Sequence, residues 1–452
     1  MQLPLLPPKV LAVLDALHLH VPLRTAVFGF QDFMRKRYTP LVANKIHSLE
    51  QSKRTELAKS TRQIQVYFLA INKSQFVYQS IYDAMAKDPV FEPIVLVCPE
   101  WVESGTNANE RLQRYFIEKG MRIATQLDPQ TPPDVVFFPN LDDRVFGGVI
   151  RLKAVYDKIL CCSMFYSMGI DNSGDFYIYQ PDFRFVWKQY VPCTFYQQLA
   201  TKHGWRKGDN VICSGSPKSD SLFGDSSDSP YWKDRTHTRK RFIWAPHWSV
   251  LVYGRMSNFD RYYKQFFTFA KNHPEIEIVL KPHPMLKPRL TDPAKKSRFR
   301  SEDPNYVEVE CLTTEREYDD FVRQWCELPN TNYMDSGDYN DLFASSDAMI
   351  LDSVSFMAEY MATEKPMCFC VREPLEQLQT RMGFNEFGKD LQSAMTIAPE
   401  WEDIERFITK VVSNGDDGLH PQRTCIVEKH LSVNKGHVGE FVANDIKRSL
   451  GR

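Results

Sequence analysis

The chain has 452 residues, of which 43% are hydrophobic and 25% are charged. This length predicts two to three globular domains, and the composition excludes a disordered chain. Fifty-six basic residues against fifty-seven acidic ones leave a formal charge of −1, so no global field recruits nucleic acid and any polyanion must be bound locally. The ten cysteines and the histidines show no metal-ligand spacing, and no apolar run reaches the roughly 18 residues of a membrane span. These features predict a reduced, cytoplasmic protein without a metal or other cofactor.

The first sixty residues differ from the rest of the chain and are predicted to form a helical extension, residues 1–60. Pro4 to Leu23 is apolar with histidines and prolines, and Phe28 to His47 mixes aromatic with basic residues. One interpretation is a helix packed on the first domain, which the interruptions at Pro22 and Pro40 favour. The other is a peripheral contact with anionic lipid at the inner face of the plasma membrane.

Short apolar runs alternate with helix-length segments over residues 61–222. Continuous apolar strands of this kind predict a parallel sheet that helices cover on both faces. The expected strands are Gln65–Ile71, Pro93–Cys98, Asp134–Pro139, Lys158–Phe165, Phe183–Trp187 and Asn210–Ser214.

A stretch rich in Ser, Asp and Pro interrupts this pattern and predicts a linker at residues 223–240. A second alternating series comes after it and predicts another doubly wound domain, residues 241–415, before a C-terminal helical segment, residues 416–452. Its expected strands are Arg241–Ala245, Ile276–Lys281, Tyr306–Val309, Met349–Asp352 and Pro366–Val371.

Two strand ends in the second series carry groups suited to one diphosphate. The first strand runs into Lys281 and His283, and the prolines on either side of the histidine stiffen the turn. The second ends in Asp352, Ser353 and Ser355, at the start of a predicted helix, where hydroxyls and free backbone N–H groups accept an anion. Glu359 shares a helix face with Ser355 and is a candidate for ribose or polyol hydroxyls. The structural alternatives are a turn histidine at His283, helix capping by Asp352 or the serines, and a solvated Glu359.

Two further groups of residues come directly after predicted strands. His247 lies between two tryptophans and is a candidate general base, a stacking partner for a nucleobase, or a half-buried structural histidine. Ser214, Ser216 and Lys218 would bring hydroxyls and a cation to the same cleft, although a plain turn has the same composition.

The order of four motifs resembles the CDP-glycerol glycerophosphotransferase family, the teichoic-acid and capsule polymerases. They are GSPKSDSL from Gly215, WAPHW from Trp244, KPHP from Lys281 and DAMILDSVSFMAEY from Asp347. The resemblance spans Lys158 to about Val371, roughly half of the chain. The last motif is the most specific.

The resemblance implies a GT-B-like architecture, in which two doubly wound Rossmann-like domains face a cleft and the C-terminal one holds a CDP-alditol donor. It implies that His283 assists the donor diphosphate, that Ser355 and its neighbours bind phosphate, and that Glu359 holds glycerol or ribose hydroxyls. The implied reaction moves glycerol phosphate, or a related alditol phosphate, to a hydroxyl of a bacterial surface polysaccharide or lipid-linked acceptor.

One element of the family pattern is missing. The family carries a Trp-His-Gly element whose histidine is taken as the general base, and the corresponding stretch, from Cys162 to Asp171, has no histidine. Asp171 and His247 are the replacement candidates. A GT-B glycosyltransferase that uses a CMP-sugar or another nucleotide sugar, and a non-catalytic nucleotide-binding scaffold, are the alternative functions.

Overall fold

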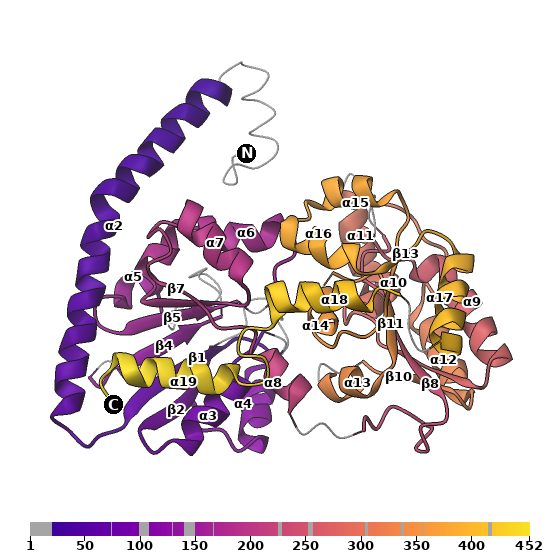
Figure 1. Cartoon of the computed structure of the whole chain (residues 1–452), viewed down its shortest axis with the longest axis horizontal. Helices are drawn as coiled ribbons and strands as arrows, with labels where there is room; N and C mark the ends of the chain where they lie inside the picture. Colours follow the sequence, from indigo (N-terminus) through magenta and orange to yellow (C-terminus); the bar gives the residue numbers. More distant parts are fainter. Residues whose placement is uncertain are drawn as a thin grey trace. The chain divides into compact units, whose positions relative to one another are not determined.

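The chain divides into two compact units by its internal contacts. The first unit comprises Met1–Tyr166, Ser173–Gly215 and Val438–Arg452, and the second comprises Ser167–Asn172 and Ser216–His437 (Figure 1). The structure is a computed structural model. It describes residues 20–73, 75–98, 108–128, 130–139, 150–165, 167–224, 228–251, 256–302, 306–335, 339–354, 356–414 and 418–452.

The first unit is built on a seven-stranded parallel sheet of order β3-β2-β1-β4-β5-β6-β7. Its central strands are largely apolar, as β4 illustrates with four buried residues, and this fits a sheet covered on both faces. The strands are β1 (Ile64–Ala70), β2 (Phe91–Val97), β3 (Ile123–Ala124), β4 (Val135–Phe138), β5 (Leu160–Met164), β6 (Lys188–Val191) and β7 (Val211–Cys213). The helices are α2 (His20–Ala58), α3 (Gln79–Lys87), α4 (Ala108–Glu118), α5 (Leu152–Val155), α6 (Asn172–Tyr179), the 3₁₀ helix η2 (Pro181–Phe185), α7 (Thr194–His203) and α19 (Val438–Ser449).

The long helix α2 runs along one side of the first unit (Figure 1). It continues through Pro40, and it buries Val42, Ile46 and Leu57. Lys53 near its end forms an ion pair of 2.9 Å with Asp134. The described part of the extension is therefore a helix that packs on the first unit, while residues 1–19 of the predicted extension lie outside the described residues.

The segment predicted as one C-terminal helical element, residues 416–452, is divided between the units. The helix α19 belongs to the first unit, where Lys447 pairs with Asp88 at 2.6 Å. It approaches α3 so closely that a Cβ on Gly439 would lie 2.3 Å from the carbonyl oxygen of Ser80, which explains the glycine. The preceding turns, α18 (His420–Ile426) and the π-helix η3 (Val427–Leu431), belong to the second unit.

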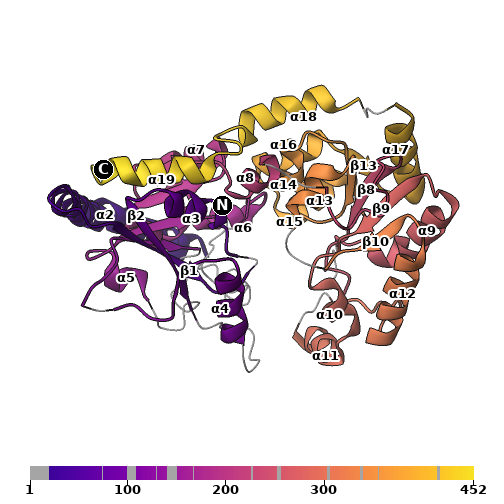
Figure 2. The ribbon, with the colours of Figure 1, turned by 90° about the horizontal axis from the view of Figure 1, so that it is seen from below.

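The second unit is built on a six-stranded parallel sheet of order β10-β9-β8-β11-β12-β13. Helices α9, α12 and α17 cover one face, and α13, α14 and α16 lie on the other (Figures 1 and 2). The strands are β8 (Lys240–Ala245), β9 (Ile276–Leu280), β10 (Thr331–Tyr333), β11 (Ala348–Leu351), β12 (Met367–Cys370) and β13 (Thr396–Ala398). The helices before α18 are α8 (Lys218–Phe223), α9 (Phe259–Asn272), α10 (Leu286–Thr291), α11 (Pro293–Glu302), α12 (Glu315–Glu327), α13 (Asn340–Ser345), α14 (Met357–Met361), α15 (Leu375–Met382), α16 (Glu386–Ser393) and α17 (Trp401–Asn414).

These two doubly wound parallel sheets confirm the predicted fold class, but two expected strands are wrong. Residues 183–187 mostly belong to the 3₁₀ helix η2, and the sheet continues instead with β6, which begins at Lys188. Residues 306–309 form no named strand, and the edge strand is the polar β10. In both places aromatic or branched residues pack in or against the core outside any named strand, so composition alone misleads.

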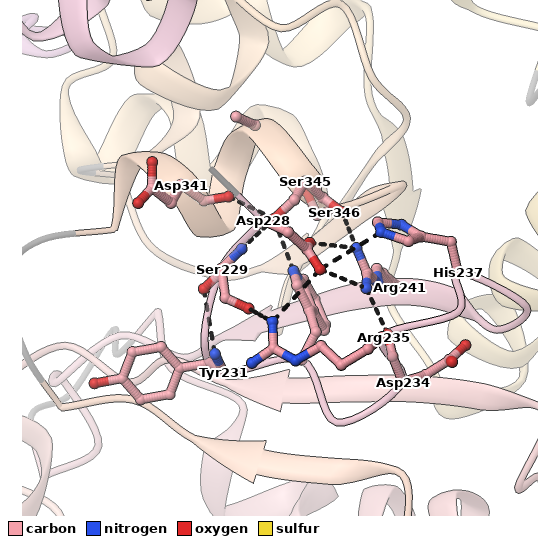
Figure 3. A network of polar contacts seen from close by, with 12 residues as sticks. Asp228, Ser229, Tyr231, Asp234, Arg235, His237, Arg241, Asp341, Ser345 and Ser346 are labelled. Atoms are coloured by element: carbon pink, nitrogen blue, oxygen red, sulfur yellow. Dashed lines mark hydrogen bonds and ion pairs between the residues drawn. The ribbon is translucent and has the colours of Figure 1, made fainter. Parts of the chain in front are cut away.

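The segment predicted as a linker, residues 223–240, is packed into the second unit where the structure describes it. Arg241 is 2% exposed, and its guanidinium pairs with Asp228 at 2.7 Å and donates to the carbonyl oxygen of Asp234 at 2.6 Å (Figure 3). Arg235 and His237 also approach Asp228, each at 3.5 Å (Figure 3). This charge network fastens residues 228–241 to the end of the sheet where β8 begins.

Candidate functional site

Two Pro-His pairs leave adjacent strands of the second sheet at equivalent positions. Strands β8 and β9 are parallel neighbours in which Trp244 is paired with Leu280. His247 and His283 each come three residues later, and the backbone N–H of His283 donates to the carbonyl oxygen of Pro246 at 3.0 Å. The shared register therefore brings both imidazoles to the carboxyl end of the sheet, where open α/β sheets bind their ligands. Their ring centroids are 5.7 Å apart.

The His247 ring is 6% exposed and is oriented by Ser249. The Ser249 backbone N–H donates to Nδ1 at 3.3 Å, and the Ser249 hydroxyl lies 2.8 Å from the same nitrogen. Because Nδ1 accepts, the neutral ring carries its proton on Nε2. Burial, with a contribution from His283, lowers the pKa of His247 to about 3, so this ring is neutral at pH 7.

His283 repeats this arrangement on the next strand. Its Nδ1 accepts the backbone N–H of Met285 at 3.1 Å, which again places the proton of the neutral ring on Nε2. Burial, Lys281 and Arg289 lower the pKa of His283 to about 4. Both histidines are thus neutral hydrogen-bond donors rather than cations at pH 7.

Lys281 is a cation buried at the same sheet end, with 1% of its surface exposed. Its ammonium lies 5.7 Å from the ring centre of Tyr339 and 5.6 Å from that of Phe356, and no described residue accepts a hydrogen bond from it. Burial lowers the pKa of Lys281 to about 8 against the opposing charge of Asp335. A buried ammonium without an acceptor is costly, and an anion would stabilise it.

Three predicted ligand contacts, Asp352, Ser353 and Ser355, come directly after β11. Both carboxylate oxygens of Asp352 accept backbone N–H groups, from His247 and from Asn258, so this residue braces the neighbouring loops. Burial raises the pKa of Asp352 to about 7 against these hydrogen bonds. Ser353 is 2% exposed, and no described residue is a hydrogen-bond partner of its hydroxyl. Ser355 lies outside the described residues.

Glu359 and Lys218, which the sequence predicted as separate ligand contacts, bind each other. The Lys218 ammonium lies 2.7 Å from one Glu359 oxygen, and the Tyr339 hydroxyl donates to the other. Burial would lower the pKa of Lys218, but the Glu359 carboxylate and the Tyr339 hydroxyl together raise it above its usual value. The ring of Tyr339 also contacts Lys281, so Tyr339 connects the pair formed by Lys218 and Glu359 with the group formed by Lys281 and the two histidines.

The remaining predicted residues are Ser214, Ser216 and Asp171. Ser214 belongs to the first unit, and its buried hydroxyl donates to the carbonyl oxygen of Gly215 at 2.9 Å. Ser216 begins the main segment of the second unit. Asp171 forms an isolated bridge with Phe384, and Asn385 donates to its carbonyl oxygen at 3.3 Å, so the segment Ser167–Asn172 is held by the turn before α16.

Sequence reasoning missed Tyr339, Ser249 and Arg289. The Arg289 guanidinium lies 4.8 Å from the ring centre of Trp248, beside the two histidines. Tyr339 and Arg289 belong to no motif at the end of a strand, and only the folded chain brings them here. Ser249 comes two residues after His247 in the stretch that follows β8, but the sequence pattern predicted no role for it. Among the described residues, no group of three or more His, Cys, Asp or Glu side chains could hold a metal ion.

Comparison with known families decides what kind of protein this is. The model of the family described as CDP-Glycerol:Poly(glycerophosphate) glycerophosphotransferase matches residues 168–447, which is more than half of the chain. The chain belongs to this family. It is accordingly an enzyme, a glycerophosphotransferase that uses CDP-glycerol, and the match spans both histidines, Lys281 and Glu359. Comparison with curated protein sequences gives no significant match.

Solved structures show the same fold as this glycerophosphotransferase. The wall teichoic acid polymerase TagF matches with a TM-score of 0.52 and 12% identity, over 95% of this chain and 97% of that one. A UDP-N-acetylglucosamine 2-epimerase matches with a TM-score of 0.54 and 10% identity, over 87% and 97%. The UDP-GlcNAc 2-epimerase from Neisseria meningitidis, bound to UDP-GlcNAc, matches with a TM-score of 0.51 and 10% identity, over 86% and 100%. At these identities the similarity establishes the GT-B-like fold alone.

Proposed function

We propose that the carboxyl end of the second sheet binds the diphosphate of CDP-glycerol, with Lys281, His283 and Ser353 as direct contacts. The observation that carries this proposal is the buried Lys281 ammonium, for which the described residues supply no acceptor. Two phosphate groups would provide the missing negative charge, and His283 offers a neutral Nε2–H donor beside it. Ser355, close to Ser353 in the sequence, remains a predicted phosphate contact.

The reaction that this site supports is a phosphoryl transfer. A hydroxyl oxygen of the acceptor attacks the phosphorus that carries glycerol, and the bond from that phosphorus to the oxygen shared with CMP breaks. CMP leaves with the bonding electron pair, and Lys281 and His283 offset the charge that develops on it. The hydroxyl proton passes to a base, for which we propose Asp171, because the stretch that resembles the family's Trp-His-Gly element has no histidine.

Glu359 enters this proposal in a different role from the predicted one. Since Lys218 and Tyr339 occupy its oxygens, it would reach a glycerol or ribose hydroxyl only by exchanging one of these partners. The hydrogen bond between Glu359 and Tyr339 holds the Tyr339 ring beside Lys281, and so helps to position the residues that line the phosphate site.

The acceptor that we propose is the growing end of poly(glycerophosphate) or a related bacterial capsule or lipid-linked polymer. Peripheral contact with the membrane through residues 1–60 would bring the enzyme to such a polymer. Support comes from α2, where Tyr38 and Leu41 are 41% and 58% exposed near the exposed basic residues Arg37 and Lys45. None of the helices in the described part of the chain is long and apolar enough to cross a bilayer. Co-sedimentation with neutral and anionic vesicles tests this contact, which requires binding to the anionic vesicles alone.

Calorimetric titration of the purified protein with CDP, CMP, UDP and ADP, without added metal, tests the donor site. We expect CDP and CMP to bind more tightly than UDP and ADP, and the Lys281→Met variant to bind CDP about ten- to a hundredfold more weakly than the wild type. Incubation with CDP-glycerol and a poly(glycerophosphate) primer should then yield CMP and a new phosphodiester, which phosphorus NMR identifies. Preference for UDP, or the absence of nucleotide binding, would contradict the proposal.

A further inference from the structure

His247 shares every orienting feature of His283, although the proposed donor site so far uses only His283. Each ring comes after a proline that leaves one of two paired strands, and each Nδ1 accepts the backbone N–H of the residue two positions later. Each Nε2 therefore carries a proton, and no described residue accepts it. The His247 residue is only 6% exposed, so its Nε2–H group has little access to solvent. A nearly buried N–H group that no described residue satisfies suits a ligand that brings an acceptor.

This tautomer also excludes the role of general base that the sequence left open for His247. A base needs a lone pair directed at the hydroxyl that it deprotonates. The lone pair of His247 is on Nδ1, where Ser249 occupies it through its backbone N–H and its hydroxyl. The ring can offer only its Nε2–H group to a ligand.

The charges around the two rings favour an anion as that ligand. Lys281 and Arg289 lie beside His283, and Asp335 acts on Lys281. The Asp352 carboxylate faces the backbone N–H of His247 rather than its ring. The rings themselves are 5.7 Å apart between centroids, close enough for both to contact one diphosphate.

We propose that His247 is a second phosphate-binding imidazole, and that it and His283 donate their two Nε2–H groups to the diphosphate of the nucleotide donor. This inference rests on the proposed function and adds a residue to it. The twin donors hold the leaving phosphate as neutral groups, so they bind it without adding two further positive charges beside Lys281.

Substitution of His247 by Gln and by Ala tests this role. A glutamine amide places an N–H donor near the position of Nε2 but cannot act as a base, whereas alanine removes the donor. We expect His247→Ala to weaken CDP-glycerol binding, measured calorimetrically without acceptor, by about ten- to a hundredfold, the loss typical of a hydrogen bond to a charged group. His247→Gln should bind within about fivefold of the wild type and keep most of its kcat. His273→Gln, on a partly exposed histidine that pairs with Glu275, is the matched control and should change neither quantity.

The outcomes separate this inference from the proposed function. If the wild type fails to bind CDP-glycerol, the proposed function fails. If the wild type binds it and His247→Ala binds it equally well, only the inference fails. If both variants bind normally and lose kcat equally, His247 is a base, and the inference is overturned.

A spectroscopic measurement keeps the test decisive should His247→Ala not fold. Long-range ¹H–¹⁵N NMR of the wild type at pH 7 reports the tautomer of each imidazole, and His247→Gln assigns the signals of His247. We expect a proton on Nε2 of both rings, and a shift of both Nε2 signals when CDP-glycerol is added. A proton on Nδ1 of His247, or an Nε2 signal of His247 that does not shift when CDP-glycerol is added, would overturn the inference.

Discussion

The two ends of the sheet in the second unit bury cations in opposite ways. At the end where the strands begin, Arg241 is 2% exposed, and both terminal nitrogens of its guanidinium bind Asp228 (Figure 3). Nearby Glu277 accepts the backbone N–H groups of Lys233 and Asp234. At the end where the strands finish, Lys281 is 1% exposed, and no described residue accepts a hydrogen bond from its ammonium.

This difference distinguishes a structural charge from a functional one. A buried charge that finds its partners within the fold is part of the stability of the unit. A buried charge that lacks them lowers stability until a ligand supplies the counter-charge. Burial alone would rank Arg241 and Lys281 together, and only their partners separate them.

The largest effect on stability should come from removing the Arg241 guanidinium, at the end of the sheet where the strands begin. Arg241→Met leaves Asp228 without its main partner and frees the segment from Asp228 to Arg241. We expect the second unit to lose about 3 to 5 kcal/mol of unfolding free energy, the range for removing one member of a buried pair. Chemical denaturation measures this loss. The control is Arg235→Met, which removes an exposed partner of Asp228 and should cost less than about 1 kcal/mol. Equal losses in both variants would contradict the assignment.

Removal of the His283 imidazole, at the end of the sheet where the strands finish, should lower kcat and leave stability unchanged. His283→Ala takes away the donor that we propose for the leaving phosphate, so kcat should fall by about 10²- to 10³-fold, as for the loss of one such donor in other enzymes. Its urea midpoint should stay near that of the wild type. Release of CMP from CDP-glycerol, measured over time, provides the rate, and retained activity would remove His283 from the site.

Removal of the Lys281 ammonium should weaken ligand binding without lowering the stability of the free protein. Lys281→Met replaces an ammonium without an acceptor by an apolar side chain of similar length, so the free protein should be as stable as the wild type or more stable. CDP affinity should fall by about ten- to a hundredfold. Thermal unfolding with and without CDP measures both quantities, because a ligand that binds only the folded state raises the melting temperature. A variant that is less stable and still binds CDP would reverse the assignment.

The smallest effect concerns pH. Burial, Lys281 and Arg289 lower the pKa of His283 from its usual 6.5 to about 4, so between these values the unfolded chain binds a proton that the folded chain lacks. The unfolding free energy therefore falls as the pH falls from 6.5 towards 4. His283→Gln removes this contribution, and the difference in its unfolding free energy between pH 7 and pH 5 should be smaller than that of the wild type. An identical decline in both proteins would show that His283 is not held neutral.

The sequence predicted this end of the sheet better than it predicted the contacts there. Lys281 and His283 come after an unmistakable apolar strand, and parallel strands all finish at one edge, so their place could be inferred. The equivalence of His247 and His283 was also present in the sequence, as a Pro-His pair after each of two strands, but only the register of β8 and β9 makes it visible. The pairing of Lys218 with Glu359 could not be inferred, because it joins two helices whose packing no local pattern specifies.

The polar elements were the hardest to infer. Strand β10 contains Thr331, Asn332 and Tyr333, and so lacks the apolar run by which the other strands were found. The charges from Asp228 to Arg241 resemble a solvated linker until Arg241 is seen to be buried. Local composition cannot tell a charge that faces water from one that faces a partner far along the chain.

The return of α19 to the first unit has a consequence for the order in which the protein is made. The ribosome completes Ser216–His437 before it adds Val438–Ser449, yet that last helix packs on α3, where Gly439 lies against Ser80. Nascent domains fold as units, ordinarily beginning with the N-terminal one. Here the second unit has all its residues first, and the first unit, although it starts earlier, must wait with its α3 surface uncovered until α19 is synthesised.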